Sequence, residues 1–259
     1  MKIHPTAIIH PKTIIDESVE IGPFCIVGED VEIKKGSKLL SHVVLKGPTL
    51  IGEENIFYQF STIGEDTPDK KFKGEKTKLE IGDRNIFREG VTVHRGTVQD
   101  KGITSIGSDN LFMAYTHVAH DCVVGDGNVF ANNAGIAGHV IVGNNITIGA
   151  LTTIHQFCSI GDYSFIGMNT SINMDIPAYV KVAADPARVI GLNSVGMSRN
   201  NITADSISLI KKAYKLVYRK GLKIDEAIKK SKKLNEGVED PFLNIFIQSL
   251  EVSERGILR

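Results

Sequence analysis

A short segment of the chain, residues 116–122 (THVAHDC), contains two histidines, the second of them directly before an aspartate. An imidazole such as that of His120 can act as a general base near neutral pH, and an adjacent carboxylate such as that of Asp121 can orient it. Two further histidines follow at His139 and His155. A lone histidine is more often structural than catalytic, so this chemistry depends on an architecture that brings the histidines together.

A six-residue repeat that runs through most of the chain provides such an architecture. Stepping by six from Ile3 meets a large apolar residue at every step to Ile63, and the register returns over 81–93 and 106–172. All 26 positions in this register are large and apolar. One strand and one turn cannot bury an apolar face alone, so three repeats are expected to close a triangular coil of about 18 residues, and coils to stack. The repeat predicts a parallel β-helix over residues 1–190.

Stacked coils would gather the candidate side chains on one edge. Residues 18 positions apart lie one above another, so His120 is expected beneath Gly138, and Gly138 beneath Gln156. Asp121 is expected beneath His139 in the same way. A glycine leaves its backbone N–H accessible, and such a donor can stabilise a developing oxyanion. A general base and an oxyanion donor are what acyl transfer to an alcohol requires when the acyl group arrives as a thioester.

The repeat is interrupted twice. Residues 65–78 are polar and charged, yet the spacing across them remains a multiple of six, which predicts a loop in place of one coil. Between Val93 and Ile106 the spacing predicts one extra residue, at about 99–102. Long loops on a rigid scaffold often carry function.

The pattern changes after Ile172, and residues 191–259 are predicted to form a helical domain. Helices are expected over 204–220 with Thr203 as N-cap, over 223–234, and from Pro241 at the first helical position to 254. One face of the first of these helices is basic, either as a solvated surface or as a docking surface for an acidic protein. Its basic residues are Lys211, Lys212, Lys215, Arg219 and Lys220.

Composition bounds the class of protein. The 259 residues include 30 basic and 30 acidic side chains, so the charge balance favours neither nucleic acid nor a membrane surface as a partner. No apolar run reaches the length of about 18 residues that a membrane span needs. Three cysteines, an odd number, argue against a disulfide framework and favour a reducing, cytoplasmic location.

Five segments resemble the UDP-N-acetylglucosamine 3-O-acyltransferase family of lipid A biosynthesis. They are SHVVLKGPTLIGEENIFYQFSTIGE, IGDRNIFREGVTVHRGT, GSDNLFMAYTHVAHDCVVGD, ANNAGIAGHV and IHQFCSIGDY. The resemblance covers essentially the whole chain and implies a left-handed β-helix. It further implies a homotrimer with active sites between subunits, working without metal or cofactor. The implied reaction moves an (R)-3-hydroxyacyl chain from acyl carrier protein to the glucosamine 3-position of a UDP-sugar, either UDP-N-acetylglucosamine or a 3-amino analogue.

The resemblance also assigns roles to residues. It implies that His120 is the catalytic base, that Asp121 positions it and that Gly138 supplies the oxyanion N–H. The implied sugar-nucleotide contacts are Asp69, Lys71, His117, His139, Gln156, Asn193 and Arg199. Met168 stands where relatives that use longer chains have glycine, which predicts a donor of about 10–12 carbons. The chain departs from the common family pattern at Pro68, Val195 and Asn200.

Three alternatives stay open at this level. The stacked histidines also suit a trimeric hexapeptide-fold carbonic anhydrase, which holds zinc with three histidines shared between subunits. A related N-acyltransferase is disfavoured because its extra N-terminal domain would precede the repeats, which begin here at Ile3. If the chain were a non-catalytic β-helix scaffold, replacement of His120 would have no effect on its function.

Overall fold

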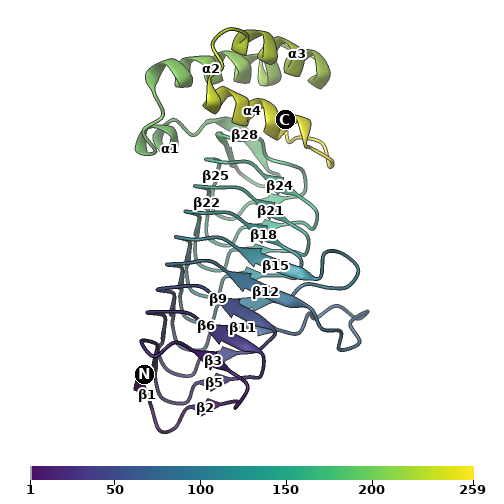
Figure 1. Cartoon of the computed structure of the whole chain (residues 1–259). Coiled ribbons are helices and arrows are strands. Elements are labelled where there is room, and N and C mark those ends of the chain that lie inside the picture. The colour runs from purple at the N-terminus through teal and green to yellow at the C-terminus, as the bar shows by residue number, and fades with distance from the viewer. Residues whose placement is uncertain (1) are drawn as a thin grey trace.

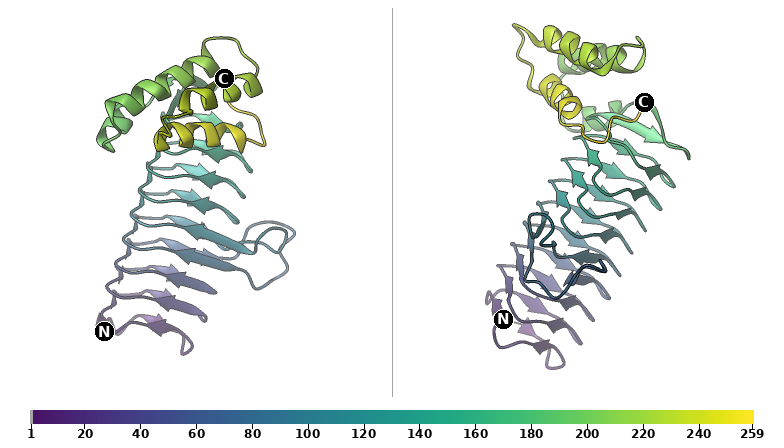
Figure 2. Two further views of the ribbon diagram at one scale, coloured as in Figure 1. Left: turned by 45° about the horizontal axis from the view of Figure 1, so that its top comes forward. Right: turned by 90° about the vertical axis from the view of Figure 1, so that its right-hand side faces the viewer.

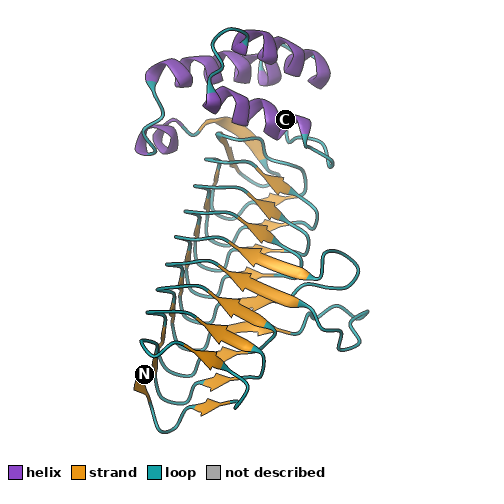
Figure 3. Cartoon of the chain, in the orientation of Figure 1, coloured by secondary structure: helices purple, strands orange, loops and turns teal. Residues whose placement is uncertain are grey.

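The chain forms a triangular prism of stacked coils with a cluster of helices at one end (Figures 1 and 3). The computed structural model describes residues 2–259, so Met1, the first residue of the predicted 1–190 unit, lies outside the described part. The N-terminus lies at the far end of the prism from the helices. This confirms the predicted class, a left-handed parallel β-helix followed by helices.

Three parallel sheets form the faces of the prism, and each coil contributes one short strand to each sheet. Sheet A contains β1 (Lys2–Ile3), β4 (Glu20–Ile21), β7 (Lys38–Leu39), β10 (Ile56–Phe57), β13 (Ile86–Phe87), β16 (Leu111–Phe112), β19 (Val129–Phe130), β22 (Thr147–Ile148), β25 (Phe165–Ile166), β27 (Val180–Ala183) and β28 (Arg188–Leu192). Sheet B contains β2 (Ile8–Ile9), β5 (Ile26–Val27), β8 (Val44–Leu45), β11 (Thr62–Glu65), β14 (Thr92–His94), β17 (His117–Val118), β20 (Gly135–Ile136), β23 (Thr153–Ile154) and β26 (Ser171–Ile172). Sheet C contains β3 (Ile14–Ile15), β6 (Val31–Ile33), β9 (Thr49–Ile51), β12 (Lys78–Ile81), β15 (Ile103–Ile106), β18 (Val123–Val124), β21 (Ile141–Val142) and β24 (Ser159–Ile160).

The core is the predicted apolar column. Of the 26 register positions, only the first three, Ile3, Ile9 and Ile15, are partly exposed, and every later one is buried. They are partly exposed because they belong to the coil at the open end of the prism, where no coil covers them from below. The three cysteines also lie in the core as free thiols, as small buried residues of the repeat.

Both interruptions differ from what the spacing suggested. The sheet C register pairs Ile51 with Ile81, 30 residues on, against 18 in a regular coil, so the first interruption inserts 12 residues into one coil. The prediction that it replaces a coil was wrong, because an insertion of two repeat lengths leaves the period intact. The pairing of Ile81 with Ile106, 25 residues on, means that the second adds seven residues rather than one. Both loops project from the same side of the prism (Figures 1 and 2).

The C-terminal region contains elements that the sequence did not predict. β27 and β28 form an antiparallel pair, and a short helix, α1 (Ser194–Arg199), follows. The three expected helices are α2 (Ala204–Tyr218), α3 (Ile224–Asn235) and α4 (Pro241–Glu251). Thr203 caps α2 and Pro241 opens α4, as the sequence indicated. Within residues 2–259, no helix combines the length and the apolar character that crossing a bilayer would require.

Candidate active site

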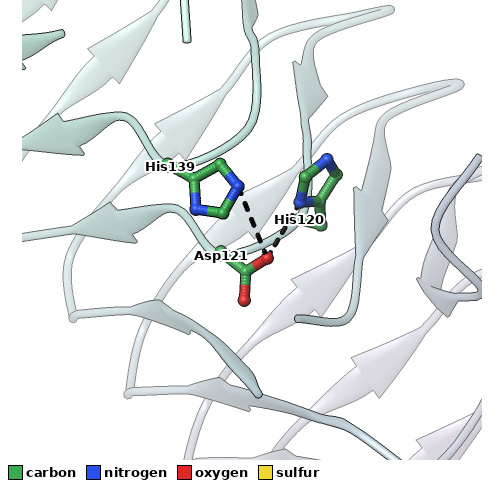
Figure 4. Close-up of side chains that lie close together, drawn as sticks. All are labelled: His120, Asp121 and His139. Atoms are coloured by element: carbon green, nitrogen blue, oxygen red, sulfur yellow. Dashed lines mark hydrogen bonds and ion pairs between the residues drawn. The ribbon is translucent and has the colours of Figure 1, made fainter. Parts of the chain in front are cut away.

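The candidate residues lie at the corner where sheet B passes to sheet C, which we call the B–C corner. Here the turn from β17 to β18 carries His120 and Asp121, and the turn of the next coil carries His139 (Figure 4). Asp121 and His139 adopt left-handed backbone conformations, with φ of 57° and 64°. Aspartate and histidine tolerate this region better than bulky residues do. The predicted stacking of these turns is confirmed by the hydrogen bond from the His139 N–H to the His120 carbonyl, 3.1 Å.

His120 and Asp121 form a hydrogen-bonded pair. The His120 Nδ1 lies 2.9 Å from Asp121 Oδ2, and the carboxylate is almost fully buried while the imidazole is 16% exposed. Burial opposes the charge of Asp121, but hydrogen bonds from His120 and Thr97 outweigh it and lower the pKa of the carboxyl. An ionised carboxylate only accepts hydrogen bonds, so the His120 proton sits on Nδ1. This leaves Nε2 as the basic nitrogen.

Gly138 lies directly above the His120 ring. A Cβ at position 138 would stand 2.5 Å from His120 Cε1 and 2.7 Å from Nε2, so only glycine leaves room for the imidazole. Within residues 2–259 the Gly138 N–H has no hydrogen-bond acceptor, whereas the neighbouring Ala137 N–H donates to the Ile154 carbonyl. A free backbone donor beside a basic nitrogen is the arrangement that a developing oxyanion and a hydroxyl proton need.

His139 contacts both carboxylates of the corner. Its Nδ1 lies 2.8 Å from Asp100 Oδ2, and its Nε2 lies 3.9 Å from Asp121 Oδ2. The ring stacks on Phe157 of the next coil, with centroids 4.4 Å apart, and meets the His120 ring edge-on at 5.1 Å. His139 is therefore held by partners on two sides and from above.

The second inserted loop, residues 95–102, supplies contacts that the sequence did not predict. Thr97 donates to Asp121, and Asp100 pairs with His139. The only sign of this loop in the sequence was the irregular spacing between Val93 and Ile106. That spacing indicated one extra residue, which gave no reason to expect a loop that contacts the next two coils.

His117, in β17, is partly buried next to other polar side chains. Its Nδ1 is 2.8 Å from the Thr92 hydroxyl, and its ring meets His94 edge-on at 5.3 Å. Burial, with the nearby His94 and His120, lowers the pKa of His117 to about 4. The ring is thus neutral near pH 7. His94 was also missed by sequence reasoning, because the insertion after it breaks the 18-residue spacing.

Asp69 and Lys71 lie in the first inserted loop. The Lys71 N–H donates to Asp69 Oδ1, 2.9 Å, which makes the pair one local turn. Arg95 fixes the base of the loop, because its buried guanidinium bonds the Gly47 and Gly64 carbonyls and pairs with Asp66. This loop and the 95–102 loop therefore emerge next to each other.

Of the remaining expected residues, Gln156 lies at the B–C corner and the others lie elsewhere on the chain. Gln156 is exposed at the B–C corner, two coils above His120. Asn193 caps α1 and donates to the Tyr163 carbonyl, and exposed Arg199 ends the same helix. Figure 1 shows α1 on the opposite edge of the prism from the two loops. Met168 lies at the corner between sheets A and B, which we call the A–B corner, and is 67% exposed.

A groove of about 770 Å³ starts at the candidate site and runs along sheet C to α4. Asp100, His139 and Phe157 line its beginning, and Ile176 and Ile245 line its apolar end. The candidate residues therefore border open space large enough for part of a substrate.

One group of side chains could hold a metal ion. Within residues 2–259, the only group of three potential metal ligands whose ligand atoms all lie within 4.8 Å of one another is His120, Asp121 and His139. One chain contributes two imidazoles and a carboxylate to this set, whereas the anhydrase alternative needs three histidines shared between subunits. A metal would also have to displace the His120–Asp121 hydrogen bond.

Comparisons with known proteins agree with this geometry. Residues 103–138 match the bacterial transferase hexapeptide family, and 175–258 match the second domain of UDP-N-acetylglucosamine O-acyltransferase. The acyl-[acyl-carrier-protein]–UDP-N-acetylglucosamine O-acyltransferases of Stutzerimonas stutzeri and Pseudomonas putida are 48% and 49% identical to this chain, with 99% of each chain covered. The crystal structure of UDP-N-acetylglucosamine O-acyltransferase from Moraxella catarrhalis superposes with a TM-score of 0.97 at 49% identity, over 100% of both chains. This chain belongs to the acyl-[acyl-carrier-protein]–UDP-N-acetylglucosamine O-acyltransferase family.

Proposed function

We propose that this protein transfers an (R)-3-hydroxyacyl group from acyl carrier protein to the glucosamine 3-hydroxyl of UDP-N-acetylglucosamine, the first step of lipid A biosynthesis. The observation that carries the proposal is the close packing of Gly138, whose N–H has no acceptor among residues 2–259, against His120 Nε2, on an imidazole fixed by Asp121. The full-length identity to relatives named for this reaction supports the choice of substrates.

The reaction needs no covalent enzyme intermediate. His120 Nε2 accepts the proton of the sugar hydroxyl as its oxygen attacks the thioester carbonyl carbon. The carbonyl oxygen becomes an oxyanion, which the Gly138 N–H stabilises. The tetrahedral intermediate then collapses, the C–S bond breaks, and the thiolate takes the proton back from His120. Asp121 holds His120 in the required tautomer and stabilises the imidazolium that forms between these steps.

Substrate contacts are assigned to residues from two subunits. His117, His139 and Gln156 lie near the base in one chain, whereas Asn193, Arg199 and Met168 lie at other edges of the prism. We place the complete site between neighbouring subunits of a homotrimer, in which the second set comes from the adjacent chain. Asp69 and Lys71 complete the nucleotide contacts from the first loop. Sedimentation at three times the 28.3-kDa chain mass is the expected result.

The acyl carrier protein is proposed to dock on the basic face of α2. Lys211, Lys212, Lys215 and Arg219 are exposed there, and among the described residues none of them has an ion-pair partner. The opposite face of the helix packs on the domain core through Ile210, Ala213, Tyr214 and Val217. A cytoplasmic location, where acyl carrier proteins work, is part of this proposal.

An assay of acyl transfer with UDP-N-acetylglucosamine and its 3-amino analogue tests the reaction and the acceptor together. His120→Ala should leave the trimer intact and lower kcat by about 10²–10⁴-fold, the usual contribution of a general base. Near-normal turnover in a folded His120→Ala protein would exclude His120 as the base. Metal analysis in parallel addresses the zinc alternative, because stoichiometric zinc required for activity would contradict the proposed mechanism.

A further inference from the structure

Thr97 holds the buried carboxylate of Asp121 with two hydrogen bonds. Its backbone N–H donates to Oδ1 at 2.8 Å, and its hydroxyl donates to Oδ2 at 2.6 Å. Thr97 is itself only 3% exposed. Thr104, which lies just beyond the other end of the 95–102 loop, accepts a hydrogen bond from the Asp121 N–H at 2.8 Å. The loop segment thus fixes both the backbone and the side chain of Asp121.

These contacts determine the orientation of the carboxylate. Each oxygen has its own donor from Thr97, so the carboxylate plane cannot rotate without losing a buried hydrogen bond. Oδ2 in turn accepts from His120 Nδ1. The same donors favour the ionised carboxylate, since the two hydrogen bonds from Thr97 act against burial and help to lower the pKa of Asp121.

We propose that Thr97 is a positioning residue for acyl transfer: by fixing the Asp121 carboxylate, its hydroxyl sets the tautomer and orientation of His120. The inference rests on the proposed function, in which His120 Nε2 is the base. Both hydrogen bonds that Thr97 donates go to Asp121 and neither goes to His120 or Gly138, so Thr97 acts through Asp121 and not on the reacting atoms. Its effect therefore falls on the chemical step and not on substrate binding.

Thr97→Val and Thr97→Ser separate the hydroxyl from the rest of the side chain. Thr97→Val keeps the shape and the backbone N–H but removes one donor, so we expect kcat to fall about tenfold while both KM values change by less than about twofold. The acid limb of the pH profile should also shift to higher pH in this variant, because the pKa of Asp121 rises when a donor to its carboxylate is removed. Thr97→Ser retains the hydroxyl and should restore both kcat and the pH profile.

Val98→Ala is the matched control, since Val98 is the next residue of the loop and is 53% exposed. It should match the parent protein in kcat and pH profile. The proposal is overturned if Thr97→Val has the parent kcat and pH profile, or if Thr97→Ser is as impaired as Thr97→Val. A loss shared by Val98→Ala would equally overturn it, because it would assign the effect to the loop as a whole.

A readout without substrate separates this inference from the proposed function. NMR of protein with isotope-labelled histidine should show a strongly hydrogen-bonded Nδ1–H that is absent from His120→Gln, and its signal should shift in Thr97→Val and return in Thr97→Ser. If this pattern appears but the parent protein does not acylate UDP-N-acetylglucosamine, the positioning role stands and the proposed reaction fails. If the signal is the same in Thr97→Val, the positioning role fails whatever the reaction is.

Discussion

Two corners of the prism share one backbone turn and differ in chemistry. At the A–B corner several turns present exposed apolar side chains, and at the B–C corner two successive turns present Asp121 and His139, which can take part in proton transfer. Examples with their φ values are Phe24 (58°), Phe60 (64°), Tyr115 (60°) and Leu151 (58°) at the A–B corner, and Asp121 (57°), His139 (64°) and Phe157 (65°) at the B–C corner. The near-identical backbone shows that turn geometry does not distinguish the proposed catalytic corner from an apolar one.

The difference lies in what surrounds each corner. At the B–C corner the 95–102 loop buries Asp121 and pairs with His139 through Asp100. At the A–B corner Phe60, Tyr115 and Met168 are each at least 65% exposed. A row of exposed apolar side chains along one edge is typical of a surface that a partner or ligand covers. The proposed trimer would place an A–B corner of one subunit beside a B–C corner of the next.

Alanine substitutions at two glycines of one coil test how strongly activity depends on the packing around His120. Gly138→Ala places a methyl group 2.5 Å from the His120 ring, so the ring must move, and we expect kcat to fall by about 10²-fold as the base and the oxyanion donor lose their alignment. Gly135→Ala is the control, because a Cβ there meets its nearest neighbour, the His117 Cβ, at an ordinary 3.8 Å. Steady-state kinetics of the two variants, with thermal unfolding as a check on folding, make the measurement. Equal activity in both would show that the space above His120 is not critical.

A substitution at Met168 tests whether the A–B corner contacts the acyl chain. The Met168 side chain is exposed at the A–B turn, and we propose that it meets the far end of the acyl chain in the site between subunits, so it should limit the length of that chain. Burial stabilises a chain by roughly 0.8 kcal/mol per methylene, so lost room for two to four carbons is worth about 1.5–3 kcal/mol, or about 10- to 100-fold in preference. We expect donors of about 10–12 carbons to be preferred over 14, and Met168→Gly to favour longer donors.

Competition between donors of different length, before and after the substitution, gives the answer. Because methionine is flexible and could move aside, Met168→Leu serves as a control of similar volume that should keep the preference. An unchanged preference in Met168→Gly would show that another residue sets the chain length.

The sequence predicted the fold well because the repeat is strictly local. Every position of the apolar column from Ile21 onward is buried as its spacing indicated, and Gly138 does lie above His120. The contacts that hold the catalytic pair were not predictable in this way. Thr97 and Asp100 reach the corner from an insertion whose length was misjudged, and the path of an irregular loop is not determined by a period. The contribution of a neighbouring subunit to the site is likewise a proposal that one chain's periodicity does not test.

The salt dependence of KM and kcat distinguishes carrier docking on α2 from the reaction at the B–C corner. Attraction between the exposed basic residues of α2 and an acidic carrier weakens over a Debye length of about 8 Å at physiological ionic strength, so the KM for the acyl carrier should rise several-fold between low and high salt. The kcat should change less, because His120 and Asp121 are shielded from solvent. Reversing the charge of Lys211 and Lys215 should abolish the salt effect, whereas reversing Lys230, which already pairs with Glu226 on α3, is the control. A flat KM across the salt series would identify the α2 face as merely solvated.

The smallest effect concerns His117, which lies in β17 just before the turn that carries His120. Burial lowers the pKa of His117 to about 4 in the folded protein, against about 6.5 in an unfolded chain, so the unfolded state binds the proton more readily between these values. Stability is therefore unaffected above about pH 6.5 and decreases as the pH falls toward 4. Because His117 is only partly buried, the loss is on the order of 1 kcal/mol, less than the full shift would give. Thermal unfolding across this range should show a shallower pH dependence for His117→Gln than for the parent protein, with exposed His155→Gln as a control for the substitution itself. A parallel pH dependence in His117→Gln and the parent would show that the ring already binds a proton in the folded state near pH 6.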